Sequence, residues 1–386
     1  MFSLPLLTAW LLSTYPLTVH ASTCPTKPVL PPWLSSPWTE SAEILENRPW
    51  TYEPECVGPS WKHAEFKDVR FCVFTTAHFH EGRGLAVITT PDAADSIFLS
   101  TGFMAPESRP RLPDVPAWEE KNLPGRGMAL VANRTIKTGE IILMDQPVLI
   151  VVREAYRLLT EVDQEMLQWK ALLRLPEAGR KAARGLAKAG LGDEIMDVMQ
   201  TNGFAQAYGG VGHVHLVPQG ARINHDCRPN AYYRYDEDMM THVVWALRDI
   251  EAGEEITHSY IHDPDVPSQK RKQVLRDTWA FECNCSICGA SKNKVEESDQ
   301  RLEIIRRQKD RLFISAGEQK KPNMTASIEE LLQLYDDEGL IFPKIELFEL
   351  GAYAYGQMGK EEMAMKYAHR AKQWWNWAVG SSVFVD

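Results

Sequence analysis

Four cysteines constrain this chain more than any other feature of its sequence. Cys283, Cys285 and Cys288 lie within six residues of one another, and Cys227 lies far upstream in the motif RINHDCRPN. Three cysteines so close together cannot all pair among themselves, and the Cys285-x-x-Cys288 spacing strains a disulfide. Four thiolates at about 2.3 Å would instead close a structural zinc site with no open position for catalysis. We predict such a Zn²⁺ site, with disulfides and free buried thiols as the alternatives.

The first 21 residues contain no Asp, Glu, Lys or Arg and end in Val19-His20-Ala21, which resembles a signal-peptidase cleavage site. We predict a signal peptide over residues 1–21 and export into the secretory pathway. The stretch has two prolines and no basic start, so an uncleaved membrane anchor and a different start are alternatives; without a functional leader the protein would be intracellular. No other window is long and apolar enough to span a bilayer, so we expect no stable membrane span after cleavage.

Other features of the sequence would fit an exported protein. Cys24, Cys56 and Cys72 could form one disulfide and leave one thiol, and the sequence does not choose the pairing. Two sequons, at Asn133 and Asn323, could carry glycans in that compartment.

Composition excludes one class of partner. The chain has 386 residues, of which 44% are hydrophobic and 24% charged, which is typical of a globular protein with two or three domains. Its formal charge is −10 and it has no long basic run, so we expect no direct nucleic-acid partner, because such binding requires Lys and Arg to neutralise phosphates. An acidic surface suits partners that carry lysine.

Local patterns divide the chain into segments of different character. Residues 22 to about 65 are rich in Pro, Trp and Ser and predict an irregular segment. Two apolar runs between Arg70 and Thr90 flank a glycine turn and predict paired strands, and a Pro-rich linker follows at 105–118. Residues 154–200 show helical spacing, and helical patterns return beyond residue 291.

One short sequence pattern occurs twice. Residues Ala132–Ile142 read ANRTIKTGEII and residues Ala246–Ile256 read ALRDIEAGEEI, and six of the eleven positions are identical. We call these the two repeat segments. Each predicts an extended run, a glycine that tolerates positive φ, and a new strand, although any two hairpins can share this turn chemistry.

Four motifs precede the cysteine tail in a fixed order. Together they resemble the SET-domain lysine methyltransferases, and among these the split SET domains of the SET-and-MYND type, over roughly residues 120–290. No further cluster of Cys and His occurs, so a MYND finger is not expected. The four motifs are Gly125-Arg126-Gly127-Met128-Ala129, Asn202-Gly203-Phe204, Asn224-His225-Asp226-Cys227-Arg228-Pro229-Asn230, and Gly253-Glu254-Glu255-Ile256-Thr257-His258-Ser259-Tyr260.

The resemblance implies an α+β chain built on the β-rich SET fold, with small sheets through which the chain threads a pseudoknot. The last helical pair is only weakly similar to a tetratricopeptide repeat. The implied parts are a signal peptide at 1–21, an N-terminal extension with a β-hairpin at 22–120, the SET domain at 121–262 with its helical insertion at 154–200, a post-SET zinc segment at 263–290, and a helical C-terminal domain at 291–386.

The resemblance also implies S-adenosylmethionine as cofactor and a lysine of a protein as substrate. Tyr260 would be the catalytic residue and would also contact the cofactor. The other implied cofactor-binding residues are Gly125, Arg126, Gly127, Asn202, Asn224, His225 and Phe281, and the implied zinc ligands are Cys227, Cys283, Cys285 and Cys288.

The implied chemistry agrees with these residue types. Methyl transfer to an amine requires a neutral nucleophile held in line, and burial in an apolar channel favours the neutral amine. Aromatic walls tolerate a cationic sulfonium. Three positions depart from the family pattern: Asp226 replaces a small serine, Gly203 follows Asn202, and His258 stands where aliphatic or hydroxyl-bearing residues are usual.

Two other functions remain open at this point. One is a catalytically inactive secreted binding protein that keeps the SET fold, and the other is a methyltransferase or cyclase-like enzyme that acts on a small metabolite. His213, His215, His258 and His262 raise the question of a second metal, but scattered surface or strand histidines explain them better.

Overall fold

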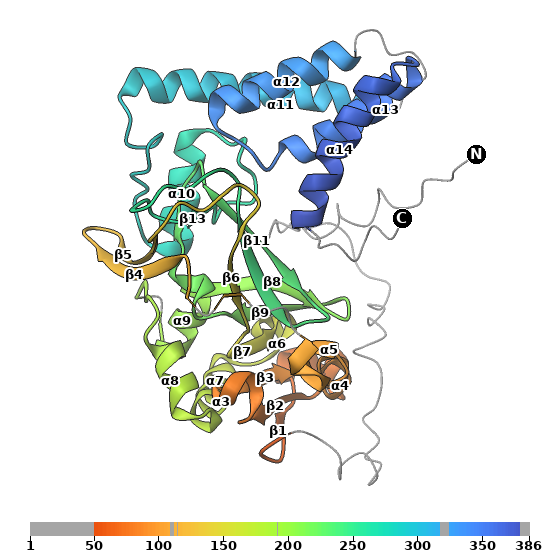
Figure 1. Cartoon of the computed structure of the whole chain (residues 1–386). Coiled ribbons are helices and arrows are strands. Elements are labelled where there is room, and N and C mark those ends of the chain that lie inside the picture. Colours follow the sequence, from red (N-terminus) through yellow and green to blue (C-terminus); the bar gives the residue numbers. More distant parts are fainter. Residues whose placement is uncertain (1–49, 109–111, 114, 191, 317–323, 379–386) are drawn as a thin grey trace. The chain divides into compact units, whose positions relative to one another are not determined.

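A computed structural model of the chain describes residues 50–378 apart from 109–111, 114, 191 and 317–323 (Figure 1). The predicted signal peptide, Cys24 and the sequon at Asn323 lie outside the described residues. None of the helices in the described ranges combines the length and the apolar character that crossing a membrane requires.

The largest sheet combines strands from the N-terminal extension with strands from the predicted SET region. Its strand order is β1-β2-β3-β7-β9-β8, and all neighbours are antiparallel except β3 and β7. The predicted strand pair at 70–90 is confirmed as β2 and β3. The strands are β1 (Glu55–Val57), β2 (Phe71–Thr76), β3 (Leu85–Thr89), β7 (Leu149–Val152), β8 (Gly203–Tyr208) and β9 (Val211–Leu216).

Strands β2, β3 and β7 are buried along their whole length, which explains their continuous apolar runs. Helices α4 and α7 pack against β2 and β3. The N-terminal helical elements are η1 (Trp61–Phe66), α3 (Phe79–Gly82), α4 (Pro91–Phe98), α5 (Thr101–Met104) and η2 (Pro106–Ser108).

The predicted helical insertion at 154–200 is present as four helices. Helix α7 begins at the Thr160 cap, whose hydroxyl accepts a hydrogen bond from the Asp163 N–H, and it buries Leu167, Ala171 and Leu172. The four helices are α6 (Arg153–Leu158), α7 (Glu161–Arg174), α8 (Glu177–Arg184) and α9 (Glu194–Asn202).

Three smaller sheets contain or adjoin the sequence motifs described above. One has the order β11-β12-β6, one is the hairpin β4-β5, and one is the parallel pair β10-β13. The parallel pair places Asn224 opposite Thr257 and His225 opposite His258. The strands are β4 (Trp118–Leu123), β5 (Gly127–Ala132), β6 (Ile141–Asp145), β10 (Asn224–His225), β11 (Ala231–Asp236), β12 (Thr241–Ala246) and β13 (Thr257–His258), and a short helix, η3 (Gly220–Arg222), precedes β10.

The two repeat segments pair with each other. The Gly139 N–H donates to the Ala246 carbonyl at 2.8 Å, and the equivalent Gly253 N–H donates to the Ala132 carbonyl at 2.7 Å. Both glycines have positive φ, 80° and 86°. The shared sequence therefore encodes two equivalent turns that bond to each other with approximate two-fold symmetry.

The C-terminal region is helical, as predicted. Helices α13 and α14 run side by side as a helical hairpin (Figure 1), in which a Cβ added at Gly351 would lie 2.3 Å from the Tyr367 ring. Arg228, directly after Cys227, forms a buried ion pair with Glu338 at 2.5 Å. The helices are α10 (Ser268–Trp279), α11 (Lys292–Ala316), α12 (Met324–Glu338), α13 (Lys344–Gln357) and α14 (Glu361–Ala378).

A disulfide joins Cys56 and Cys72, which lie directly opposite each other in β1 and β2. The sequence left the pairing open, and the structure selects these two cysteines. Because β1 is a three-residue edge strand with mostly exposed side chains, this covalent bond is a main attachment of the strand.

We expect the Cys56→Ser variant to lose about 2–3 kcal/mol of unfolding free energy, because the bond closes a short loop in the unfolded chain. Urea unfolding of the non-reduced proteins measures this. A mild reductant should lower the wild type toward the variant and leave the variant unchanged. Equal stability of the two non-reduced proteins would contradict the prediction.

Four histidines on strands are buried, and three of them, His213, His215 and His258, are among those expected to be surface or strand histidines. His213 and His215 on β9, His242 on β12 and His258 on β13 are all at most 5% exposed. Among the described residues, the group that could hold a metal ion is the four-cysteine cluster. Desolvation by burial lowers the pKa of His213 and of His258 to about 4 and that of His242 to about 3.

These pKa shifts predict that acid destabilises the protein. Between pH 6.5 and 4 the unfolded chain binds protons at these histidines and the folded chain does not, so the unfolding free energy falls as the pH falls. Each histidine contributes up to about 1.4 kcal/mol per pH unit. Urea unfolding at several pH values measures the slope, which His242→Phe should reduce by one proton. An unchanged slope for His242→Phe would contradict this account.

Candidate functional site

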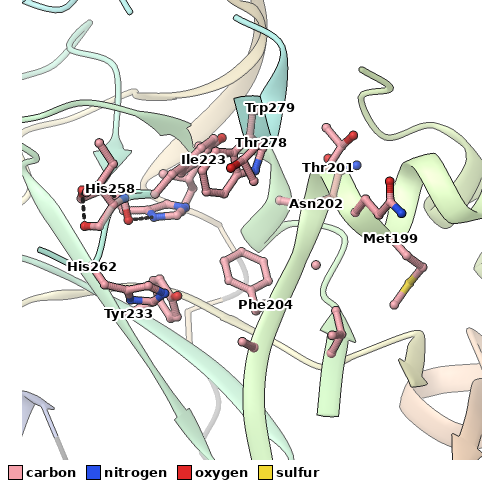
Figure 2. A pocket seen from close by; sticks show the side chains of 18 of the residues that line it. Met199, Thr201, Asn202, Phe204, Ile223, Tyr233, His258, His262, Thr278 and Trp279 are labelled. Atoms are coloured by element: carbon pink, nitrogen blue, oxygen red, sulfur yellow. Dashed lines mark hydrogen bonds between the residues drawn. The ribbon is translucent and has the colours of Figure 1, made fainter. Parts of the chain in front are cut away.

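A cavity of about 560 Å³ lies among β8, α9, β13 and the end of α10. Aromatic side chains form much of its wall, and Figure 2 shows Phe204, Tyr233, His258 and Trp279 placed around the same space. Phe204 and Tyr233 meet edge to face, with ring centroids 5.0 Å apart. The wall is therefore apolar and rich in π-faces, which suits a cationic or methylated ligand.

Tyr260, the predicted catalytic residue, lines this cavity just beyond β13. Its hydroxyl donates to the Ile223 carbonyl at 3.1 Å. Desolvation by burial raises the pKa of Tyr260 above its ordinary value, so the side chain remains a neutral phenol. With its proton committed to Ile223, the oxygen has lone pairs left to accept a hydrogen bond.

The His225 ring links Tyr260 to the cysteine cluster. The Tyr260 N–H donates to Nδ1 of His225 at 3.0 Å, and Nε2 of His225 lies 3.3 Å from the Cys227 sulfur. Since a backbone N–H can only donate, Nδ1 is the acceptor and Nε2 carries the proton. Desolvation by burial lowers the pKa of His225 to about 3, which keeps the ring neutral. His225 therefore donates to the Cys227 sulfur.

Glu255 holds two residues of the predicted motifs, Arg126 and Asn224, in place beside β10. Its carboxylate pairs with the Arg126 guanidinium at 2.6 Å and accepts a hydrogen bond from the Asn224 amide at 2.9 Å. Arg126 also donates to the His225 carbonyl at 3.1 Å. Glu255 is not among the predicted site residues, although it lies in the Gly-Glu-Glu-Ile motif, because charged residues in such a turn are usually solvated.

Gly125 and Gly127 flank Arg126 at the β4–β5 turn. Both have a φ of 74°, a left-handed conformation that favours glycine. A Cβ at either position would have no atom within 4 Å. Glycine is therefore required by the backbone conformation, and the space beside it is open.

The remaining predicted cofactor residues divide between two places. Asn202 lines the cavity, but its amide donates to the Ala187 and Val198 carbonyls, both at 2.8 Å. The Phe281 ring lies 6.2 Å from His225 and 6.3 Å from Tyr260, centroid to centroid. The structure thus places Asn202 on the cavity and gathers Arg126, Asn224, His225 and Phe281 near β10, with Tyr260 between the two groups.

The four predicted metal ligands come together. The sulfurs of Cys227, Cys283, Cys285 and Cys288 are buried, form no disulfide, and lie within 4.8 Å of one another. Cys227 is 3.9 Å from Cys283 and 3.6 Å from Cys288, sulfur to sulfur. Zn–S bonds of about 2.3 Å in a tetrahedron require sulfurs about 3.8 Å apart. The cluster therefore has the donor set and the size of a tetrahedral zinc site.

Comparison with known proteins identifies the class of domain that carries this site. Residues 127–261 match the family model of the SET domain. The matched segment includes β10, β13 and Tyr260, and the cysteine tail follows it.

Relatives are similar over this part of the chain. The chain is 38% identical over 78 residues to histone-lysine N-methyltransferase set5 of Schizosaccharomyces pombe, covering 20% of this chain and 24% of that protein. It is 39% identical over 75 residues to human histone-lysine N-methyltransferase SMYD3, covering 19% and 17%. It is 34% identical over 119 residues to histone-lysine N-methyltransferase ATXR2 of Arabidopsis thaliana, covering 30% and 22%. The matches thus span about a quarter or less of these relatives.

We expect His225→Leu to destabilise the protein by about 1–3 kcal/mol, because it removes an acceptor from the Tyr260 N–H and a donor from the Cys227 sulfur. His225→Gln can provide both an acceptor and a donor and should lose less. Urea unfolding of the three proteins measures the difference. Equal losses for Leu and Gln would show that the ring acts by packing alone.

Proposed function

We propose that the chain is an S-adenosylmethionine-dependent methyltransferase that modifies a lysine side chain of a protein. The observation that carries this proposal is Tyr260, which lies in the segment that matches the SET domain, lines an aromatic cavity, and donates its hydroxyl proton to the Ile223 carbonyl. Relatives named as histone-lysine N-methyltransferases support the substrate class. A split SET domain without a MYND finger is the finer family assignment that we propose.

Bound S-adenosylmethionine would supply the methyl group, and the chain's own residues would place the two reactants. The aromatic wall excludes water and favours the neutral amine that attacks the methyl group. The Tyr260 oxygen can accept a hydrogen bond from that amine or a contact from the polarised methyl group. Catalysis here rests on orientation, because no proton has to leave the phenol.

The open space beside the β4–β5 turn supports a cofactor position near Gly125, Arg126 and Gly127. Because the Asn224 amide and the His225 ring already have internal partners, we propose that these residues meet the cofactor mainly through their backbone. Asn202 and Phe281 would border the bound cofactor from the cavity and from the tail.

We propose that the cysteine cluster holds one structural Zn²⁺. Four sulfur ligands leave no open position for a reacting water, so the ion would stabilise the fold and take no part in methyl transfer. Its effect on the reaction would pass through the hydrogen bond between His225 and Cys227.

We also propose export through the secretory pathway. The disulfide between Cys56 and Cys72 supports an oxidising compartment, because such bonds are rare in the cytosol. Zinc coordination would protect the other four thiols there. Secretion of an epitope-tagged chain that depends on residues 1–21 would test this proposal.

We expect Tyr260→Phe to lower methyl transfer about 100-fold, because the oxygen that orients the amine is lost. Labelled S-adenosylmethionine, the purified chain, and histones or a protein extract as acceptors give the measurement. Tyr353→Phe, a substitution on an exposed part of α13, is the matched control and should leave transfer unchanged.

The same assay separates the alternatives. Failure of the chain to bind S-adenosylmethionine in calorimetry would end the methyltransferase proposal and leave a binding protein with the SET fold. Transfer to small amines without transfer to any protein would instead indicate an enzyme of small metabolites.

A further inference from the structure

Arg271 on α10 is a cation in the interior of the protein. Its side chain is 1% exposed and is among the largest fully buried side chains. None of the ion pairs found among the described residues includes it, although a buried charge is costly unless an opposite charge lies close by. The guanidinium therefore needs another source of negative charge.

The cysteine sulfurs are that source. One terminal nitrogen of Arg271 donates to the Val266 carbonyl at 2.6 Å, and the other lies 4.0 Å from the Cys288 sulfur. Its Nε has no hydrogen-bond partner. Neutral thiols would leave the guanidinium unpaired, whereas thiolates would pair with it.

The charge of a zinc site explains why a cation is needed. Four thiolates and one Zn²⁺ carry a net charge of −2 in a buried place. The other donors to the sulfurs are neutral: the His225 ring donates to Cys227, and the Cys288 N–H lies 3.5 Å from the Cys285 sulfur. Lys272 is near but donates to the Cys288 carbonyl. Arg271 is thus the buried side-chain cation that faces the sulfurs of the described cluster.

We propose that Arg271 is the counter-cation of a tetrathiolate zinc site and is a positioning residue for the metal. It neutralises half of the excess negative charge of the zinc-bound cluster and so slows loss of the ion. This inference rests on the zinc proposal above, and its experiment is arranged so that each can fail separately.

The experiment compares zinc retention in the purified full chain and in Arg271→Met and Arg271→Lys. Zinc content is measured by atomic emission, and zinc release into excess chelator is followed by absorbance of a zinc-binding dye. Arg271→Met should bind zinc about 10–100-fold more weakly, the usual effect of removing a partner of metal ligands. Arg271→Lys keeps the charge and should lose less. Arg276→Met changes an exposed arginine of the same helix, paired with Glu282, and should behave as the wild type.

Thermal melts with and without metal distinguish charge compensation from packing. With zinc bound, Arg271→Met should melt below the wild type. Arg271→Met should lower the melting temperature less after zinc removal than with zinc bound, because the charge of the zinc site that Arg271 compensates is present only when the ion is bound. A structural role would lower the melting temperature equally in both states and overturn the inference.

The remaining outcomes are also decisive. A wild type without metal would refute the zinc proposal itself. A wild type with one zinc, and an Arg271→Met variant that releases it no faster, would refute the role of Arg271 alone. Where Arg271→Met does not fold, Arg271→Gln removes the charge while keeping a donor for Val266, and the same loss of zinc is expected of it.

Discussion

A run of hydrogen bonds from the Tyr260 N–H through the His225 ring to the Cys227 sulfur holds the candidate site together. The Tyr260 N–H can only donate, so Nδ1 of His225 is the acceptor. Nε2 of His225 then carries the proton, and it donates to the Cys227 sulfur. Cys227 in turn lies against three sulfurs from the tail of the domain. The position of Tyr260 in the cavity therefore depends on the tail being held in place, and the cysteine cluster and the cavity form one structural unit.

The C-terminal helical region contacts the residues that follow Cys227. Arg228 follows Cys227 and is paired with Glu338, which is 5% exposed and also accepts a hydrogen bond from Ser298. Tyr232 stacks on Phe342 with ring centroids 3.6 Å apart. Breaking a buried pair of this kind leaves an uncompensated charge, so separation of the helices would disturb the residue next to the metal ligand.

Sequence alone predicted the parts of this arrangement whose chemistry is local. Cysteine spacing predicted the four-cysteine cluster. The repeated sequence predicted a glycine turn in each of the two repeat segments. Each of these patterns has few physical explanations. Parallel pairing of β3 with β7 was not predictable, since local sequence does not encode which distant strand completes a sheet. Glu255 and Arg271 were missed for a related reason: a charge in a turn or on a helix is usually solvated, and only the fold reveals its buried partners.

The motif assignments of Asn224 and His225 illustrate a further limit. Spacing can place a residue at a site, but it does not say which of its atoms face a ligand. The structure gives both side chains internal partners, so their tasks are to fix β10 against Glu255, Tyr260 and Cys227.

Three groups in or next to the cavity wall, His225, His258 and Tyr260, share one electrostatic property. Burial lowers the pKa of His225 to about 3 and that of His258 to about 4, and it raises the pKa of Tyr260. All three are neutral between about pH 5 and 9, where a histidine or an amine would ordinarily offer a titrating group. These three groups therefore do not change charge near neutral pH.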